Sequence, residues 1–108
     1  MKTDNLNNYI RGWIVGSFTK SLYSKDYEIG IKEYKSGNKE RSHAHFLSEE
    51  VTVVLSGKVK MNGAEYSSGE IIIQEKGEYT DFECLEDCIT LIYRPDGSFP
   101  NDKFFKEE

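Results

Sequence analysis

The stretch that decides the fold spans residues 37–57 and reads GNKERSHAHFLSEEVTVVLSG. It contains both histidines of the chain, His43 and His45, two positions apart. In an extended strand, side chains two apart point to the same face, so these two imidazoles would lie side by side. Glu50 begins the apolar run VTVVL, and a strand there would carry its carboxylate back toward the imidazoles. Two imidazoles and a carboxylate suit a divalent transition metal such as zinc, iron, nickel or manganese.

Length and charge exclude several classes of protein. A chain of 108 residues is expected to form one domain. The net charge is −5, from 14 Lys and Arg against 19 Asp and Glu, and the basic residues are scattered. Nucleic-acid binding is therefore not expected, because it would need a basic stripe. No apolar run approaches the length of a membrane span, and the first twelve residues lack the apolar centre of a signal peptide. We expect a cytoplasmic protein that does not bind membranes.

Short apolar or alternating segments, separated by glycine turns, run through most of the chain. Residues 27–32 alternate in the period of a half-buried strand. Asn62-Gly63, between two extended segments, favours a two-residue type I′ hairpin. The other expected strands are 13–18, 41–46, 51–55, 58–61, 65–66, 71–73, 80–85 and 89–93, and the other expected turns are Ser56-Gly57, Ser68-Gly69, Lys76-Gly77 and Glu86-Asp87. No helix of any length is expected. The pattern predicts an all-β sandwich or barrel of about eight to ten strands.

The spacing of the histidine stretch resembles the first conserved motif of the cupins: Gly37, five residues, His43, one residue, His45, four residues, Glu50, six residues, Gly57. The resemblance implies a cupin-type double-stranded β-helix, which is a jelly-roll barrel. A second motif is expected at residues 69–84. There Gly69 and Gly77 match, whereas Glu75, Thr80 and Cys84 stand where the family usually has proline, histidine and asparagine. The resemblance implies one cupin domain over residues 1–108, with residues 1–8 and 96–108 as peripheral tails.

The resemblance also implies a metal site with His43, His45 and Glu50 as ligands. Thr80 replaces the usual third histidine, and Glu75 or Tyr79 is a candidate replacement. Two histidines and one carboxylate would leave positions open for substrate or oxygen. Two alternatives stay open. The histidines either form hydrogen bonds inside a polar barrel and bind an organic ligand directly, or one of them acts as an acid or base without a metal.

Two classes of function follow from these alternatives. The first is an enzyme acting on a small polar molecule in the barrel, for which the RSHAH segment is similar to the HAH segment of cupin-type ketoisomerases that act on nucleotide sugars. That similarity implies a carbohydrate or nucleotide-sugar substrate, with His43 or His45 as the base and Tyr79 or Tyr66 assisting proton transfer. The second is a non-catalytic protein that binds or senses a small molecule. The sequence leaves open whether the protein is an enzyme.

Two further expectations concern assembly and the cysteines. Small barrels with exposed edge strands often pair, so we expect a homodimer. Trp13 and the pair Phe104-Phe105 would either cap the barrel or contribute to that interface. Cys84 and Cys88 lie on either side of an expected turn. They are interpreted as buried thiols without a chemical role.

Overall fold

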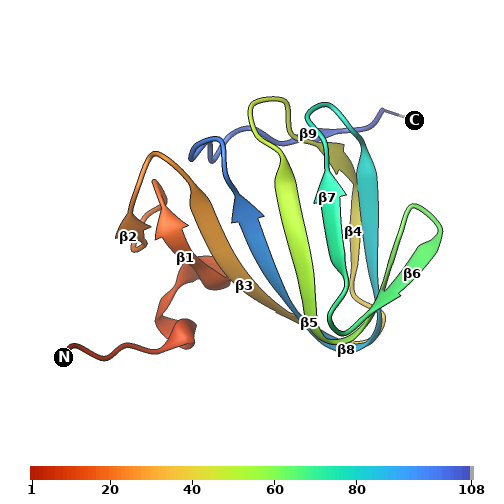
Figure 1. Ribbon diagram of the computed structural model, residues 1–108, viewed down its shortest axis with the longest axis horizontal. Coiled ribbons are helices and arrows are strands. Elements are labelled where there is room, and N and C mark those ends of the chain that lie inside the picture. The colour runs from red at the N-terminus through yellow and green to blue at the C-terminus, as the bar shows by residue number, and fades with distance from the viewer. Residues whose placement is uncertain (108) are drawn as a thin grey trace.

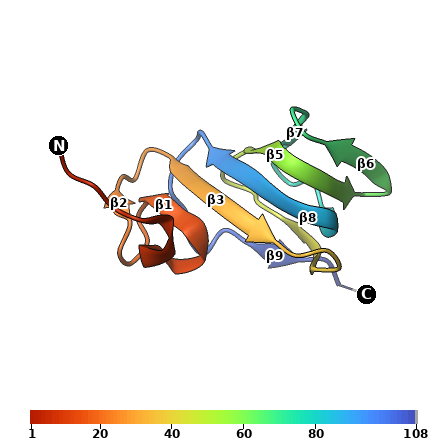
Figure 2. The same cartoon turned by 90° about the horizontal axis from the view of Figure 1, so that it is seen from below.

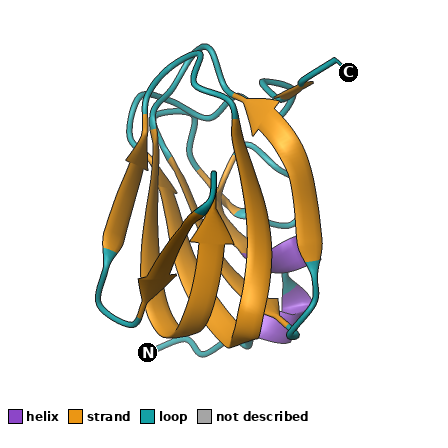
Figure 3. Cartoon of the chain, turned by 90° about the vertical axis from the view of Figure 1, so that its right-hand side faces the viewer, coloured by secondary structure: helices purple, strands orange, loops and turns teal. Residues whose placement is uncertain are grey.

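One hydrogen-bonded sheet of nine strands makes up most of the chain (Figure 1). The computed structural model describes residues 1–107, and Glu108, the last residue of the expected C-terminal tail, lies outside them. The strands are β1 Trp13–Gly16, β2 Leu22–Tyr23, β3 Glu28–Tyr34, β4 Lys39–Ala44, β5 Glu50–Met61, β6 Ala64–Ser67, β7 Ile71–Gln74, β8 Thr80–Arg94 and β9 Phe104–Phe105. Two 3₁₀ turns, η1 Leu6–Asn8 and η2 Ile10–Gly12, precede them and lie at one corner of the molecule (Figure 3). The all-β prediction is confirmed.

The two long strands, β5 and β8, connect the two layers of the jelly roll. The second half of β8 pairs with β3, its first residues pair with β4, and β5 runs antiparallel to it over most of its length. Seen from below, β3, β8 and β5 run side by side, and β9 lies on the opposite side of the barrel (Figure 2). β9 pairs with β4 and closes the end of the barrel where the histidines lie. No helix in residues 1–107 is long and apolar enough to cross a membrane.

Two of the expected turns are wrong. Ser56-Gly57 and Glu86-Asp87 lie inside continuous strands, at the point where β5 and β8 bend together and their register shifts. Gly57 has a φ of +82°, and a Cβ there would lie 2.3 Å from the carbonyl oxygen of Asp87. The glycine therefore permits a bulge with close backbone contact, which in the sequence looks like a turn.

The hairpin expected at Asn62-Gly63 is confirmed. Met61 pairs with Ala64, and both turn residues have positive φ, +48° and +82°. This is the type I′ geometry that joins two strands with the correct twist.

The core lies at the end of the barrel away from the histidines. It contains the buried side chains of Val54, Val59, Met61, Phe82, Cys84 and Cys88. Both cysteines are free and buried, as expected. Burial and the neighbouring Cys84 raise the pKa of Cys88 to about 12, so its thiol stays protonated and unreactive. The two cysteines belong to one continuous strand and not to the two sides of a turn.

Candidate functional site

The interior of the barrel carries a row of polar side chains across four adjacent strands. Glu28 on β3 pairs with Arg94 on β8, and Glu50 on β5 pairs with Gln74 on β7. Val51 pairs with Tyr93, which places Glu50 next to Arg94 and completes the row. All four side chains are buried. The row therefore brings one guanidinium between two carboxylates inside the protein.

Arg94 makes hydrogen bonds with three side chains in this interior. Its Nη1 donates to Glu28 Oε1 at 2.9 Å, and its Nε donates to Glu50 Oε1 at 3.0 Å. Its Nη2 lies 3.0 Å from Glu50 Oε1 and 3.1 Å from His45 Nε2. Glu28 Oε2 accepts a further hydrogen bond from the hydroxyl of Ser98. A buried charge is tolerated only when it is paired and hydrogen-bonded in this way.

His45 is held in one tautomer by partners on both ring nitrogens. Its Nδ1 donates to the carbonyl oxygen of Asp102, so Nε2 carries the lone pair that accepts from Arg94. Burial, followed by the positive charge of Arg94, lowers the pKa of His45. The imidazole therefore stays neutral, as a hydrogen-bond acceptor for the guanidinium.

The C-terminal segment fixes the loop that follows His45. The carboxylate of Asp102 accepts hydrogen bonds from the backbone N–H groups of Phe46 and Leu47, both at 2.9 Å. Asp102 is 5% exposed although it lies within the expected peripheral tail. One residue thus holds the imidazole through its carbonyl group and the adjacent loop through its side chain.

His43 lies beside His45 and has a different environment. The two rings meet edge to face, with centroids 5.2 Å apart. Its Nδ1 lies 2.9 Å from the carbonyl oxygen of Arg41, which leaves Nε2 without a hydrogen-bond partner among the described residues. His43 contributes to the wall of the central cavity. A neutral His43 with this tautomer has a lone pair that is available to accept a proton or a hydrogen bond.

The polar row opens onto a cavity of about 520 Å³. Its wall combines hydroxyl and amide groups with apolar side chains: Thr52, Thr80, Thr90 and Gln74 with Trp13, Met61, Phe82 and Ile92. Thr90 is fully buried, and its Oγ1 is the one buried side-chain oxygen or nitrogen in residues 1–107 without a hydrogen-bond partner. A buried hydroxyl without a partner is costly, so a water or ligand atom is expected there.

Burial shifts the pKa values of two ionisable groups in the cavity wall. Burial lowers the pKa of Lys32 to about 8, and its Nζ lies 4.1 Å from the centroid of the Trp13 ring. Burial and the charge of Glu40 raise the pKa of Tyr34, whose hydroxyl donates to Glu40 at 2.9 Å. Tyr34 is therefore protonated at neutral pH, and Lys32 is close to titrating.

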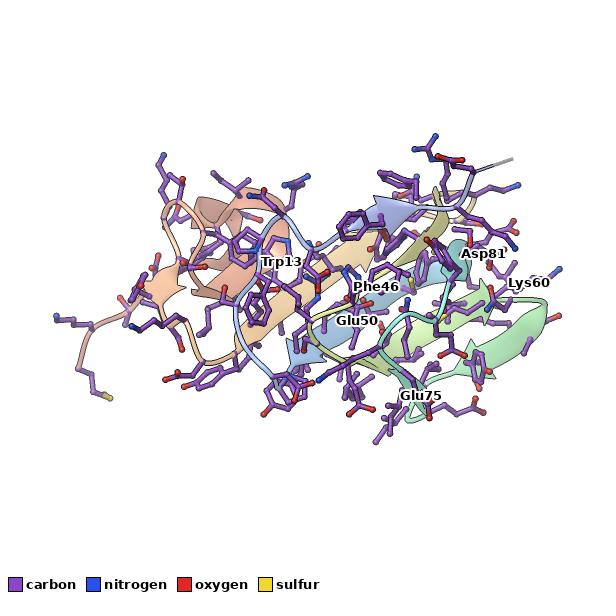
Figure 4. The ribbon with its side chains drawn as sticks, turned by 90° about the horizontal axis from the view of Figure 1, so that it is seen from above. Trp13, Phe46, Glu50, Lys60, Glu75 and Asp81 are labelled. Atoms are coloured by element: carbon purple, nitrogen blue, oxygen red, sulfur yellow. The ribbon has the colours of Figure 1, made fainter. Side chains whose placement is uncertain are left out.

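The structure brings together some of the residues selected from the sequence and separates others. His45 Nε2 lies 3.5 Å from Glu50 Oε1, and His43 is adjacent to His45. Thr80, in the position of the usual third histidine, lines the cavity. Tyr79 packs edge to face on Phe46 and is not among the cavity-lining residues described. Glu75 lies at the periphery, away from Glu50 (Figure 4).

The arrangement does not fit a metal ion. Within residues 1–107, no three His, Cys, Asp or Glu side chains are grouped so that they could hold one. The two atoms that would bind a metal, His45 Nε2 and Glu50 Oε1, both accept hydrogen bonds from the guanidinium of Arg94. The guanidinium group of Arg94 therefore occupies the region where the side chains of these predicted ligands converge. Ligation by His43, His45 and Glu50 stays a prediction from the sequence.

Sequence reasoning missed Arg94 and Glu28. Glu28 lies within the expected strand 27–32 and Arg94 directly follows the expected strand 89–93, and charged residues along strands are usually on the solvated outer face. The alternation of side chains along a strand could have shown that Arg94 is buried. Arg94 is two positions from Ile92 and four from Thr90, so all three side chains lie on the same face of β8.

Comparisons with known proteins address the fold. No family model matches the chain, and none of the curated proteins searched matches it. Among solved structures, a conserved protein with a double-stranded β-helix domain from Klebsiella pneumoniae is 19% identical with a TM-score of 0.72, covering 98% of this chain and 90% of that one. A cupin-2 domain protein from Shewanella frigidimarina is 22% identical with a TM-score of 0.59, covering 65% and 71%. The fold is that of the cupins.

A third solved structure, the DMSP lyase DddQ from Ruegeria pomeroyi, is 15% identical with a TM-score of 0.72. The match covers 87% of this chain and 49% of the lyase chain. Other similar structures are an oxalate decarboxylase, a polyketide cyclase and a complex of a sigma factor with an anti-sigma protein. These similar structures include enzymes and a protein–protein complex, and identities this low establish the fold alone.

Proposed function

We propose that this cupin binds a small, uncharged polar molecule in the central cavity without using a metal ion. The observation that carries the proposal is the position of Arg94, whose guanidinium is bound by Glu28, Glu50 and His45. The guanidinium supplies a positive charge in this part of the barrel, and it uses Glu50 Oε1 and His45 Nε2, the two atoms that a metal ion would need as ligands. The site then has a fixed, internally paired cation and not an exchangeable one.

The cavity wall supports an uncharged, hydroxylated ligand. The cavity volume lies within the range of small-molecule sites, about 300–1,000 Å³. Several charged side chains around it already have partners: Arg94 pairs with Glu28 and Glu50, Lys103 pairs with Glu40 at 3.9 Å, and Lys32 Nζ donates to the carbonyl oxygen of Arg11 at 2.6 Å. Among the buried side-chain oxygen and nitrogen atoms of residues 1–107, the one without a hydrogen-bond partner belongs to a neutral group, the Thr90 hydroxyl. A sugar, or the sugar part of a nucleotide-sugar, has the hydroxyls that such a wall would bind.

Two classes of activity remain for such a site, and a different observation favours each. The locked neutral state of His45 and the internal pairing of Arg94 favour a non-catalytic binding or sensing protein, because few groups are left to react. The tautomer of His43 favours an acid/base enzyme, with Nε2 as the base that takes a proton from the bound molecule. Tyr34 lines the cavity and Tyr79 is not among the lining residues, but the raised pKa of Tyr34 and the hydrogen bond from its hydroxyl to Glu40 make it a weak proton donor.

The proposal is tested by ligand binding to metal-free protein and to a Thr90→Val variant. Untagged protein is treated with a chelator, checked by elemental analysis, and screened by ligand-observed NMR against monosaccharides and nucleotide-sugars. Valine has the shape of threonine but lacks the hydroxyl, so Thr90→Val should weaken binding roughly tenfold, the value of about one hydrogen bond. Thermal stability should stay equal or rise, because an unpaired buried hydroxyl is removed.

The matched control is Thr19→Val, which makes the same change at an exposed position and should leave affinity unchanged. Binding that appears only after a divalent metal is added would refute the metal-free proposal. Binding that is unaffected by Thr90→Val would place the ligand outside this cavity. For the enzyme alternative, His43→Gln should abolish turnover of a bound sugar while ligand binding is retained.

A further inference from the structure

The wall of the central cavity contains an amine that the proposed function does not use. Lys32, on β3, lines the cavity and is half-buried, so a small molecule in the cavity can reach it. Its Nζ donates to the carbonyl oxygen of Arg11 at 2.6 Å. Within residues 1–107, Lys32 forms no ion pair with a carboxylate, whereas Lys103, the other lysine of the cavity wall, pairs with Glu40. The partner of the Lys32 amine is therefore a neutral backbone carbonyl.

The strand register places Lys32 beside the unpaired hydroxyl of Thr90. Lys32 on β3 pairs directly with Thr90 on β8. Directly opposed residues of two antiparallel strands lie on the same face of the sheet, with Cβ atoms about 4.5–5.5 Å apart. Thr90 is fully buried, and its Oγ1 has no hydrogen-bond partner among the described residues. One part of the cavity wall thus offers a polar molecule both an amine and a free hydroxyl.

The surroundings of the Lys32 amine are aromatic and rich in positive charge. Its Nζ lies 4.1 Å from the centroid of the Trp13 ring, and that ring packs against Gly30, two positions earlier on β3. Burial lowers the pKa of Lys32 to about 8. The charged groups that also act on it are Glu40, which favours the protonated amine, and Arg11, Arg94 and Lys103, which oppose it. Three cations and one carboxylate therefore face the amine from four different segments of the chain.

These surroundings favour a nucleophilic amine. Lysines that attack carbonyl groups are activated by desolvation in a pocket or by a neighbouring cation, and Lys32 has both. At pH 7, about 9% of an amine with a pKa of about 8 is neutral, against about 0.03% of one with the ordinary value of 10.5. The hydrogen bond to Arg11 uses one N–H and leaves the lone pair of the neutral amine free.

We propose that Lys32 forms an imine with an aldehyde or ketone bound in the central cavity. The lone pair of Nζ adds to the carbonyl carbon, and the π electrons of the carbonyl group move to its oxygen. That oxygen then leaves as water with the two protons that Nζ gives up, and a C=N bond remains. The step consumes no oxidant or reductant.

The open-chain form of a sugar fits this chemistry. It has the carbonyl group that Lys32 would attack and the hydroxyls that the Thr90 side chain would bind. In this respect the inference rests on the proposed function, which supplies the class of ligand. It adds a covalent and reversible attachment at one named atom of the cavity wall.

The test is to trap the imine in the untagged full chain with D-glyceraldehyde and cyanoborohydride, which delivers hydride to the carbon of the C=N bond. Proteolysis and tandem mass spectrometry then measure the reduced adduct on each lysine. At pH 7, Lys32 should react at least about tenfold faster than Lys60, because more of its amine is neutral. Lys60 is a suitable comparison because it is also half-buried on a strand, but it is not among the cavity-lining residues and lies far from Trp13 (Figure 4).

Concentration dependence and a pair of matched variants complete the experiment. The rate at Lys32 should saturate as glyceraldehyde is increased, because the aldehyde binds in the cavity before it reacts, whereas the rate at Lys60 should rise linearly. Lys32→Arg keeps the positive charge and removes the primary amine, so the fast phase of labelling should disappear. Lys60→Arg should leave the fast phase unchanged. The comparison of Lys32 with Lys60 in the wild type does not depend on the folding of either variant.

The outcomes separate this inference from the proposed function. Equal labelling of Lys32 and Lys60, or a fast phase that persists in Lys32→Arg, would overturn the imine. If sugars bind to the metal-free protein by NMR and Lys32 is not labelled, the imine is wrong and the proposed function stands. If Lys32 is labelled selectively but neither monosaccharides nor nucleotide-sugars bind, the imine stands and the sugar is the wrong class of ligand.

Discussion

Replacing Arg94 with methionine removes the guanidinium and keeps most of the side-chain volume. Glu28 is fully buried and Glu50 is 9% exposed, so the change leaves two buried carboxylates without their cation. Removing one partner of a buried ion pair costs about 3–5 kcal/mol of folding free energy. For a domain of this size, each kcal/mol lowers the melting temperature by roughly 4–8 °C. Urea denaturation and calorimetry at pH 7 should therefore show a decrease of at least roughly 12 °C.

The pH dependence of this loss separates electrostatics from packing. An unpaired buried carboxylate binds a proton more readily than an exposed one. In the Arg94→Met variant, the folded state therefore takes up protons that the unfolded state does not, and its stability should approach that of the wild type as pH falls from 7 to about 5. Arg41→Met, at an exposed arginine over the Phe105 ring, should cost no more than about 1 kcal/mol. A loss below about 1 kcal/mol for Arg94→Met, or an equal loss at both pH values, would contradict the assigned role of the guanidinium.

For two further sites, His45 and Gly57, the structure predicts the direction in which folding stability changes. Because burial and Arg94 lower the pKa of His45, the unfolded chain binds more protons than the folded one below pH 6.5, so stability should fall as pH decreases through that value. His45→Gln should show a weaker pH dependence in urea denaturation, and an unchanged slope would argue against a buried neutral imidazole. Gly57→Ala should cost about 3 kcal/mol or more, since its φ is +82° and a Cβ would contact Asp87 and Cys88. Gly63→Ala, with the same φ but nothing within 4 Å, should cost about 1 kcal/mol, and equal losses in the two variants would refute the contact argument.

Much of the fold was predictable because local signals agreed with the final structure. The alternation of residues 27–32, the Asn62-Gly63 hairpin and the absence of long helices all depend on short-range sterics and burial. The bends at Gly57 and Asp87 were not predictable in the same way. A glycine with positive φ has one local signature whether it ends a strand or bulges within it, and only the partner strand distinguishes the two.

The site was predicted in part. The spacing of His45 and Glu50 placed both side chains in the barrel interior, where the structure finds them 3.5 Å apart. Arg94 escaped prediction because its environment is created by Glu28, 66 residues earlier in the chain. Period-two alternation shows that a strand has two faces but not which face is inside, and here the charged face is inside. A rule that places charges in solvent fails where charges compensate one another across strands.

The pairing of β8 with three other strands has a consequence for the order of folding. β3, β4 and β5 all depend on residues 80–94 for a neighbour, and the imidazole of His45 depends on Asp102. During synthesis, β3, β4 and β5 are therefore made before their partner β8. Until β8 is made, the edges of these strands and their aliphatic side chains stay exposed. Long-range β pairing of this kind is slow, in the range of milliseconds to seconds. The interval before β8 emerges is when the nascent protein is most vulnerable to aggregation.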